Sequence, residues 1–211
     1  MDWWRTRGNT LVKIKLYVEG GGDSKSQHVN CREGFRKLLE NAGFKGKMPR
    51  IVACGGRRTV YDKFITSVNS NESDYNPMML IDSETRVTNH NLWEFLKESE
   101  GWDKPDNSDD SQVQLMAQCM ETWCVVDRET LRSFFGQCLN EASLPPLNNL
   151  ESRDKKEILQ ALENATCQCE KDRKYKKGKR SFKLLGELNT DVLMNELYYF
   201  KRLCETLEEK L

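Results

Sequence analysis

The fold is decided by the stretch Val12-Lys13-Ile14-Lys15-Leu16-Tyr17-Val18-Glu19-Gly20-Gly21-Gly22-Asp23. Its even-numbered positions from 12 to 18 are apolar, whereas Lys13, Lys15 and Tyr17 fill the alternate positions. A period of two predicts a half-buried β-strand. The glycines then turn the chain, and residues 24–27 have the capping-box pattern that opens a helix.

The segments that follow repeat this alternation of strand and helix. A helix that ends at Gly43 precedes a short strand at residues 50–54, and an amphipathic helix precedes a third strand at residues 77–81. The third strand is apolar throughout, as expected for a central parallel strand. Residues 113–117 are a candidate fourth strand. The pattern predicts an α/β fold with a βαβαβ core, a mostly parallel sheet and flanking helices.

Carboxylates directly follow two of the predicted strands. Glu19 comes after the first strand, and Asp82 and Glu84 come after the third. Ligands of open parallel sheets bind beyond the carboxyl ends of the strands, where we expect these side chains to meet. Oxygen ligands suit Mg²⁺ or Mn²⁺, and Mg²⁺ commonly bridges to substrate phosphates. The expected catalytic residues are Glu19, Asp82 and Glu84, which would also bind the metal together with Asp23.

The acidic pair needs a positive partner. In extended backbone Asp82 and Glu84 would project to the same side. Two such charges about 4 Å apart repel by about 4 kcal/mol at an effective dielectric near 20. A cation, an arginine or a proton must relieve this repulsion. The alternative to a metal is a solvated loop paired with Arg57 or Arg86.

Two groups of basic residues are candidates for binding phosphate. Arg57 and Arg58 begin a helix near the same edge of the sheet, although ordinary salt bridges to the acidic pair would also explain them. The second group lies in the basic segment 171–183, which can follow a phosphate backbone or can simply be a solvated surface. Its candidate residues are Lys174, Lys176, Lys177, Lys179 and Arg180.

Glu121 lies in a mostly apolar stretch beside Trp123. An unpaired carboxylate is costly in such surroundings. We therefore expect Glu121 to orient the metal ligands from behind, to act as an additional ligand, or to form a structural ion pair.

Composition excludes several classes of protein. The 211 residues contain 33 Lys and Arg against 33 Asp and Glu, which argues against disorder and against a uniformly basic nucleic-acid binder. Neither a signal peptide nor a bilayer-spanning apolar run is present, so we expect a cytoplasmic protein with no membrane contact. In that compartment the eight cysteines should be reduced thiols. Neither a P-loop nor a dinucleotide-binding fingerprint occurs.

A linker at Pro145-Pro146 separates an expected α/β domain at 1–144 from a C-terminal helical extension at 145–211. The extension ends in an apolar stripe with alternating spacings of four and three residues: Leu193, Leu197, Phe200, Cys204, Leu207 and Leu211. Such a stripe is typical of a helix that packs on its own domain. A homodimer through this C-terminal helix is the alternative.

These residues also resemble a known pattern. A glutamate after the first strand and an acidic pair after a later strand resemble the Toprim fold of topoisomerases, primases and OLD-type nucleases. Nearly the whole chain also resembles a bacterial family catalogued as a domain of unknown function, often regarded as Toprim partners of ABC-type or OLD-type ATPases in phage-defence gene pairs. The likeness is carried by Val18-Glu19-Gly20-Gly21, Cys54-Gly55-Gly56-Arg57, Asp82-Ser83-Glu84, Gln118-Cys119-Met120-Glu121-Thr122-Trp123 and Arg180-Ser181-Phe182.

The resemblance implies Mg²⁺-dependent cleavage of DNA or RNA by a phage-defence effector. Glu19 would correspond to the family glutamate, and Asp82 and Glu84 to the metal-binding acidic pair, although many Toprim domains have Asp where this chain has Glu84. The alternative is a non-catalytic, Toprim-shaped partner or regulator of an ABC- or OLD-type ATPase. Nucleotidyl transfer is a third use of the fold.

Overall fold

The structure is a computed structural model that describes residues 13–70 and 75–211. Within these residues a four-stranded parallel sheet has the order β2-β1-β3-β4. Its strands are β1 (Lys13–Val18), β2 (Arg50–Ala53), β3 (Tyr75–Asp82) and β4 (Val113–Met116). All four strands that the sequence predicts are present, and only Val12 of the first lies outside the described residues.

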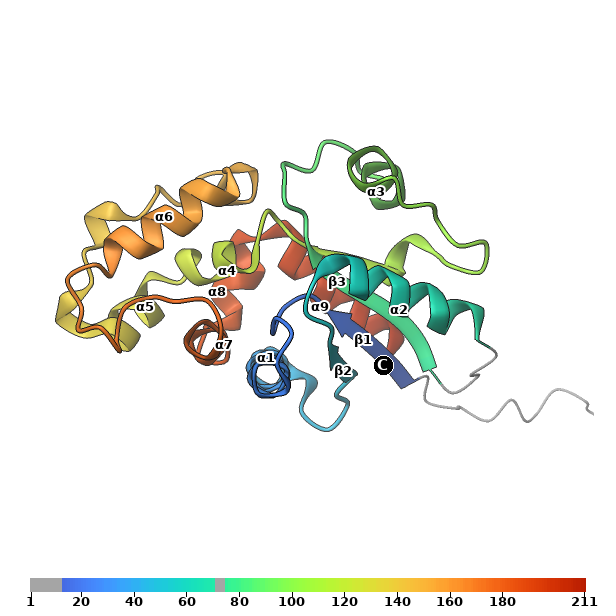
Figure 1. Ribbon diagram of the computed structural model, residues 1–211, viewed down its shortest axis with the longest axis horizontal. Coiled ribbons are helices and arrows are strands. Elements are labelled where there is room, and N and C mark those ends of the chain that lie inside the picture. The colour runs from blue at the N-terminus through green and yellow to red at the C-terminus, as the bar shows by residue number, and fades with distance from the viewer. Residues whose placement is uncertain (1–12, 71–74) are drawn as a thin grey trace, which may run out of the picture.

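Helices connect and cover the strands (Figure 1). They are α1 (Lys25–Leu39), α2 (Arg57–Asn69), α3 (Leu92–Glu100), α4 (Met120–Val126), α5 (Arg128–Phe135), α6 (Lys155–Ala165), α7 (Lys179–Leu185), α8 (Thr190–Glu196) and α9 (Tyr198–Lys210). The expected cap is confirmed at α1, where the Ser24 hydroxyl accepts from the Gln27 amide. At α6 the Asp154 carboxylate accepts from the Lys156 amide. None of the described helices is long and apolar enough to cross a bilayer.

The sheet is covered on both faces because successive residues of a strand point to opposite sides. Leu16 and Leu80 join the main core with α1, α4 and α9, whereas Tyr17 and Ile81 join a second core with α2 and α3. The chain moves from β1 to β2 in one direction and back past β1 to β3 in the other. Right-handed crossovers therefore place α1 and α2 on opposite faces.

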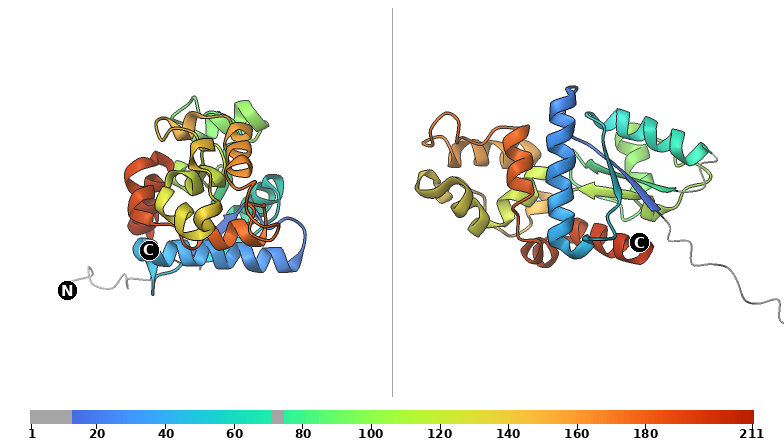
Figure 2. Two further views of the ribbon diagram at one scale, coloured as in Figure 1. Left: turned by 90° about the vertical axis from the view of Figure 1, so that its left-hand side faces the viewer. Right: turned by 90° about the horizontal axis from the view of Figure 1, so that it is seen from below.

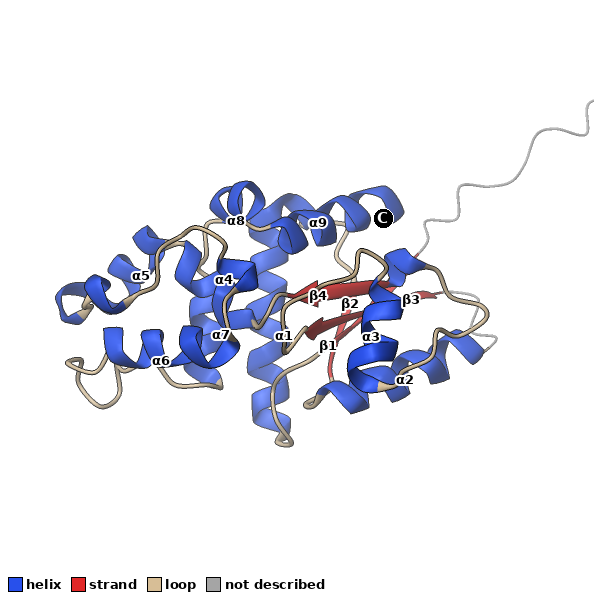
Figure 3. Ribbon diagram, turned by 90° about the horizontal axis from the view of Figure 1, so that it is seen from above, coloured by secondary structure: helices blue, strands red, loops and turns tan. Residues whose placement is uncertain are grey.

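The last helices belong to the same main core as the strands. Figure 3 shows α4, α5, α6 and α7 gathered beside the sheet, with α1 between them and the strands, and the right-hand view of Figure 2 shows the same arrangement from below. The main core includes Leu193, Phe200 and Leu207 together with Leu16. The boundary expected after residue 144 stays a prediction.

The apolar stripe at the C-terminus is buried within the chain, but it is not one helix. Leu197 has an extended backbone and separates α8 from α9. The Glu151 carboxylate accepts from the amides of Tyr198 and Tyr199, each at 2.9 Å, and so caps the second helix. The stripe packs on its own protein, and the predicted homodimer stays untested.

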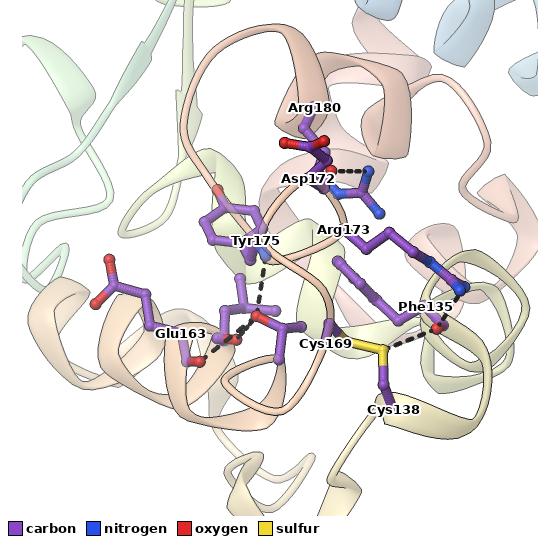
Figure 4. Close-up of a disulfide and its surroundings, with 10 residues drawn as sticks. Phe135, Cys138, Glu163, Cys169, Asp172, Arg173, Tyr175 and Arg180 are labelled. Atoms are coloured by element: carbon purple, nitrogen blue, oxygen red, sulfur yellow. Dashed lines mark hydrogen bonds between the residues drawn. A yellow bond between two sulfur atoms is a disulfide. The ribbon is translucent and has the colours of Figure 1, made fainter.

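One cysteine prediction is wrong. Cys138 and Cys169 form a disulfide although they lie 31 positions apart in the sequence (Figure 4). The packing of the segment after α6 against the end of α5 brings their Cα atoms to 5.0 Å, a separation that suits a disulfide. The other six cysteines are free thiols.

Candidate functional site

The register of the sheet brings Glu19 beside Asp82. Val18 pairs with Leu80, so the residues that follow them lie at one level of the sheet. The Glu19 amide donates to the Leu80 carbonyl at 2.9 Å, and the Asp82 amide donates to Glu19 Oε2 at 3.0 Å. The strand order reverses at β1, so these carboxyl ends form the switch point at which ligands bind in open parallel sheets.

Glycines let two loops approach closely beside Glu19. Gly20 and Gly55 exchange backbone hydrogen bonds of 2.8 and 2.9 Å. A Cβ atom on Gly55 would lie 2.7 Å from the Gly22 carbonyl oxygen, and Gly55 has a φ of +77°. Only glycine adopts that backbone readily and leaves room for the neighbouring loop. The glycine-rich turns therefore shape the floor of the site.

The turn after β3 positions the acidic pair. Asp82 Oδ1 accepts from the Met120 amide at 2.9 Å, where α4 begins. Glu84 has a φ of +64°, in the left-handed region, which is uncommon for a residue with a side chain. Its amide donates to the Gln118 carbonyl at 3.0 Å. The expectation of extended backbone from Asp82 to Glu84 is wrong, because this turn hydrogen-bonds to the segment after β4.

The three predicted carboxylates nevertheless converge. Glu19, Asp82 and Glu84 each offer an oxygen atom, and these atoms all lie within 4.8 Å of one another. Burial raises the pKa of Glu19 to about 8, and the adjacent Asp82 carboxylate adds to this shift. Burial likewise raises the pKa of Asp82 to about 6, against the opposing effect of Lys155. We call these three residues the acidic cluster.

Lys155, which the sequence did not single out, is the positive partner of the acidic pair. Its Nζ lies 3.2 Å from Asp82 Oδ2 and also contacts Glu84 Oε1. Burial lowers the pKa of Lys155, but the carboxylates of Asp82 and Glu84 outweigh that effect and raise it overall. The alternative pairing with Arg57 or Arg86 is not found among the described salt bridges of this pair.

Glu19 and Asp82 of the acidic cluster line a cavity of about 310 Å³, which we call the acidic cavity. Its walls include Glu121 and Lys177 besides Glu19, Asp82 and Lys155. The chain therefore places Glu121 in the same cavity as the candidate ligands.

Glu121 is almost fully buried, with 2% of its surface exposed. The Tyr175 hydroxyl donates to Glu121 Oε1 at 2.6 Å, and Lys177 Nζ lies 3.4 Å from the same oxygen. Burial and the Glu121 carboxyl raise the pKa of Tyr175 well above its ordinary value, so the phenol keeps the proton that it donates. Both partners come from the basic segment, and no sequence pattern indicates that this segment lies beside Glu121.

A larger hollow of about 1000 Å³, the basic groove, adjoins the acidic cavity. Gln27, Lys177 and Gly178 line both. One wall of the groove is the start of α1, and the other carries the predicted phosphate-binding residues Lys174, Lys176, Lys177, Lys179 and Arg180. The structure thus gathers these five residues in one groove next to the acidic cluster.

Arg180 is already engaged within the chain. Its guanidinium carbon lies 4.8 Å from the centre of the Phe134 ring, and Nη1 donates to the Asp172 carbonyl at 3.0 Å. Figure 4 shows Cys169, Asp172 and Tyr175 along the segment before α7, with Arg180 in the first turn of that helix. A phosphate contact by Arg180 would have to compete with these interactions.

The remaining predicted residues lie at different distances from the acidic cluster. Arg57 is close enough for its charge to lower the pKa of Glu19, but it pairs with Glu100 at 3.2 Å and lies over Trp102. Arg58 is exposed and pairs with Asp62 at 3.0 Å. Asp23 is exposed at the end of the glycine turn and is not part of the acidic cluster.

The donor atoms of the acidic cluster suit a hard divalent cation. Carboxylate oxygens are the ligands that Mg²⁺ prefers. Two charges 4.8 Å apart would repel by about 3–4 kcal/mol at an effective dielectric of about 20. Burial and repulsion disfavour the charged forms of Glu19 and Asp82, as their raised pKa values show. A cation among these oxygens would offset both effects.

Comparison with known proteins agrees with the fold. The model of a family described as "Domain of unknown function (DUF4276)" matches residues 18–208. The C-terminal region of the Burkholderia pseudomallei OLD protein is similar over 94% of this chain and 98% of its own, with a TM-score of 0.52 and 13% identity. The corresponding region of the Xanthomonas campestris pv. campestris OLD protein has a TM-score of 0.43 and 13% identity, with 93% of each chain covered. No curated protein matches.

The likeness to the Burkholderia region shows a shared fold. It covers nearly the whole of both chains, and it confirms the Toprim-like α/β arrangement that the sequence predicts.

Proposed function

We propose that this chain, which belongs to the DUF4276 family, is a metal-dependent nuclease that hydrolyses phosphodiester bonds of nucleic acid. The observation that carries the proposal is the convergence of Glu19, Asp82 and Glu84 within 4.8 Å at the carboxyl edge of a Toprim-like sheet. The cluster lies beside a groove rich in lysine. Carboxylates for a cation and lysines for phosphates are the two components that this chemistry requires.

Each residue of the site has a defined task in this proposal. Glu19, Asp82 and Glu84 would hold Mg²⁺ or Mn²⁺. When bound, such a cation stabilises charge on the phosphoryl oxygens and favours deprotonation of an attacking water. The backbone amides of Asp82 and Met120 fix the Glu19 and Asp82 carboxylates, so little reorganisation is needed at the moment of reaction.

The basic side chains would position the substrate. Lys177 lines both hollows, so it can contact a phosphate that passes from the basic groove into the acidic cavity. Lys174 and Lys176 are exposed along the groove and can neutralise neighbouring phosphates. Arg57 and Asp23 are proposed at the margin of the site, as a phosphate contact and as a further metal ligand. We further propose a role as an effector in bacterial phage defence, together with an ABC- or OLD-type ATPase, which is what the sequence resemblance to Toprim partners of such ATPases implies.

The test is nicking of supercoiled DNA and cleavage of RNA, including tRNA, with Mg²⁺ or Mn²⁺. Asp82→Ala/Glu84→Ala should lower the cleavage rate by about 10³-fold or more, because the substituted side chains can no longer hold the cation. The matched control is Glu98→Ala/Asp106→Ala, which removes two exposed carboxylates outside the site. Cleavage at full strength in the Asp82→Ala/Glu84→Ala protein would remove the assignment.

One observation favours a second candidate. Lys155 already pairs with Asp82 and Glu84, as in a purely structural salt bridge. The chain would then be a non-catalytic, Toprim-shaped partner or regulator of an ABC- or OLD-type ATPase. Calorimetric titration with Mn²⁺ separates the two candidates: binding that Glu19→Gln abolishes favours the nuclease, and no binding favours the regulator.

A further inference from the structure

Lys155 contacts the acidic cluster at the carboxylate oxygen atoms that a metal ion would also use. Its ammonium group contacts one oxygen of Asp82 and one of Glu84. Within residues 13–70 and 75–211, no other cation forms a salt bridge with either carboxylate. Lys155 thus supplies the positive charge that the acidic pair requires in the absence of a metal.

We propose that Lys155 is a tethered counter-ion that neutralises the acidic cluster when no metal is bound and competes with the divalent cation for it. The inference rests on the proposed function, because it concerns the same metal site. Both cations would use the carboxylate oxygens of Asp82 and Glu84. Two positive charges at such a short distance repel each other, so a bound ion and the ammonium group cannot both keep their best positions.

The position of Lys155 permits this exchange without a change of fold. It is the first residue of α6, and the preceding Asp154 caps the helix. The helix is anchored by its own buried residues, Ile158 and Leu162, rather than by the lysine. The lysine side chain is 19% exposed, and its flexible stem allows the ammonium group to withdraw toward solvent. Displacement by a metal therefore requires only a rotation of the side chain.

The same contact explains how the cluster exists before metal binding. Three carboxyl groups are held together at the edge of the core, with oxygen atoms within 4.8 Å of one another, where their negative charges repel. The ammonium group of Lys155 offsets part of this repulsion. A site with a built-in cation stays assembled, but it binds an added cation less tightly than a vacant one.

The test is calorimetric titration of the full chain with MnCl₂. Lys155→Met should bind Mn²⁺ about tenfold more tightly than the unchanged protein, because the competing charge is gone. Lys155→Arg keeps the charge and should restore the weaker binding. The matched control is Lys156→Met, which removes the neighbouring exposed lysine of the same helix and should leave the affinity unchanged. Circular dichroism establishes that each variant is folded, and Lys155→Gln replaces Lys155→Met if the latter is not.

The outcomes are distinguishable. If the unchanged protein binds Mn²⁺ and the charge-removing variants bind it equally or more weakly, the counter-ion proposal is overturned while the metal site stands. Equal tightening in Lys156→Met would also overturn it, since a general loss of positive charge would then explain the effect. If none of the proteins binds Mn²⁺, the acidic cluster is not a metal site. Both the proposed function and the proposed competition by Lys155 are then overturned.

Discussion

The acidic cavity and the basic groove meet at Lys177 and Gly178, yet the protein holds them in different ways. The carboxylates follow parallel strands, and backbone amides fix two of them. The lysines of the groove project from a segment outside the sheet, which Tyr175 and the disulfide Cys138–Cys169 tie to the core. In the proposed nuclease, the groups that need fixed geometry lie on the sheet, and the groups that attract a polyanion lie on a tethered surface.

Removing the Cys138–Cys169 disulfide should have the largest effect on the free energy of unfolding. We expect Cys138→Ser/Cys169→Ser, or a thiol reductant, to lower the free energy of unfolding by about 2–4 kcal/mol, because the disulfide no longer restricts the unfolded chain. Urea denaturation with and without reductant measures this loss. Cys167→Ser, at an exposed free thiol of the same segment, is the control. Equal stability of the reduced and oxidised proteins would contradict the account of how the groove is held.

The hydrogen bond from Tyr175 to Glu121 is the second link between the two regions. Tyr175→Phe removes a 2.6 Å donor to a buried carboxyl. The free energy of unfolding should fall by about 1–3 kcal/mol, because one buried oxygen loses its best partner. Tyr198→Phe alters a tyrosine that is 61% exposed and should stay within about 0.5 kcal/mol of the unchanged protein. Similar values for the two variants would show that the link contributes little.

The part of the pH dependence of stability that comes from Glu19 should report the acidic cavity. The pKa of Glu19 is raised from 4.5 to about 8, so the folded state binds its proton more tightly than the unfolded state. This contribution is fully present below about pH 4.5 and is lost as the pH rises toward about 8. In metal-free buffer the slope from Glu19 can reach at most about 1.4 kcal/mol per pH unit.

Thermal unfolding across that range, in the presence of a chelator, should show a steeper decline for the unchanged protein than for Glu19→Gln. Parallel curves for the two proteins would mean that Glu19 does not carry the shift.

Removing positive charge from the basic groove should have the smallest effect of these changes. It should weaken nucleic-acid binding and leave the acidic cavity intact. We expect Lys174→Ala/Lys176→Ala to weaken nucleic-acid binding by about tenfold and to reduce the slope of log affinity against log salt by about 2. Fluorescence anisotropy of a labelled oligonucleotide with a chelator present measures both quantities. The control is Lys97→Ala/Lys104→Ala, which removes lysines that pair with Asp103 and Asp110. An unchanged salt slope would place the nucleic acid elsewhere.

The strands and the carboxylates that follow them could be predicted from the sequence, because the patterns that indicate them lie within short segments. Alternating apolar residues locate the strands, and the carboxyl ends of neighbouring parallel strands share one edge, so Glu19 and Asp82 could be brought together without coordinates. Glu84 was placed correctly for the wrong reason, since it reaches the cluster from a left-handed turn rather than from extended backbone.

The contacts made by the helices after β4 could not be predicted in the same way, because they join residues far apart in the chain. Asp154 caps α6, but nothing in the sequence indicates that the next residue, Lys155, reaches Asp82 across a separation of 73 positions. The disulfide spans 31 positions, and its cysteines lie outside any recognised spacing pattern. Lysine-rich composition suggested a basic surface, whereas the rings beneath Arg180 depend on how α5 and α7 pack.

Anomalous diffraction from a crystal soaked in MnCl₂ tests whether the three carboxylates hold one cation. We expect a manganese peak at bonding distance, about 2 Å, from oxygen atoms of Glu19, Asp82 and Glu84, with the Lys155 ammonium group moved away from the acidic pair. A fully soaked crystal with no peak among these three side chains, or with manganese bound only elsewhere, would contradict this expectation.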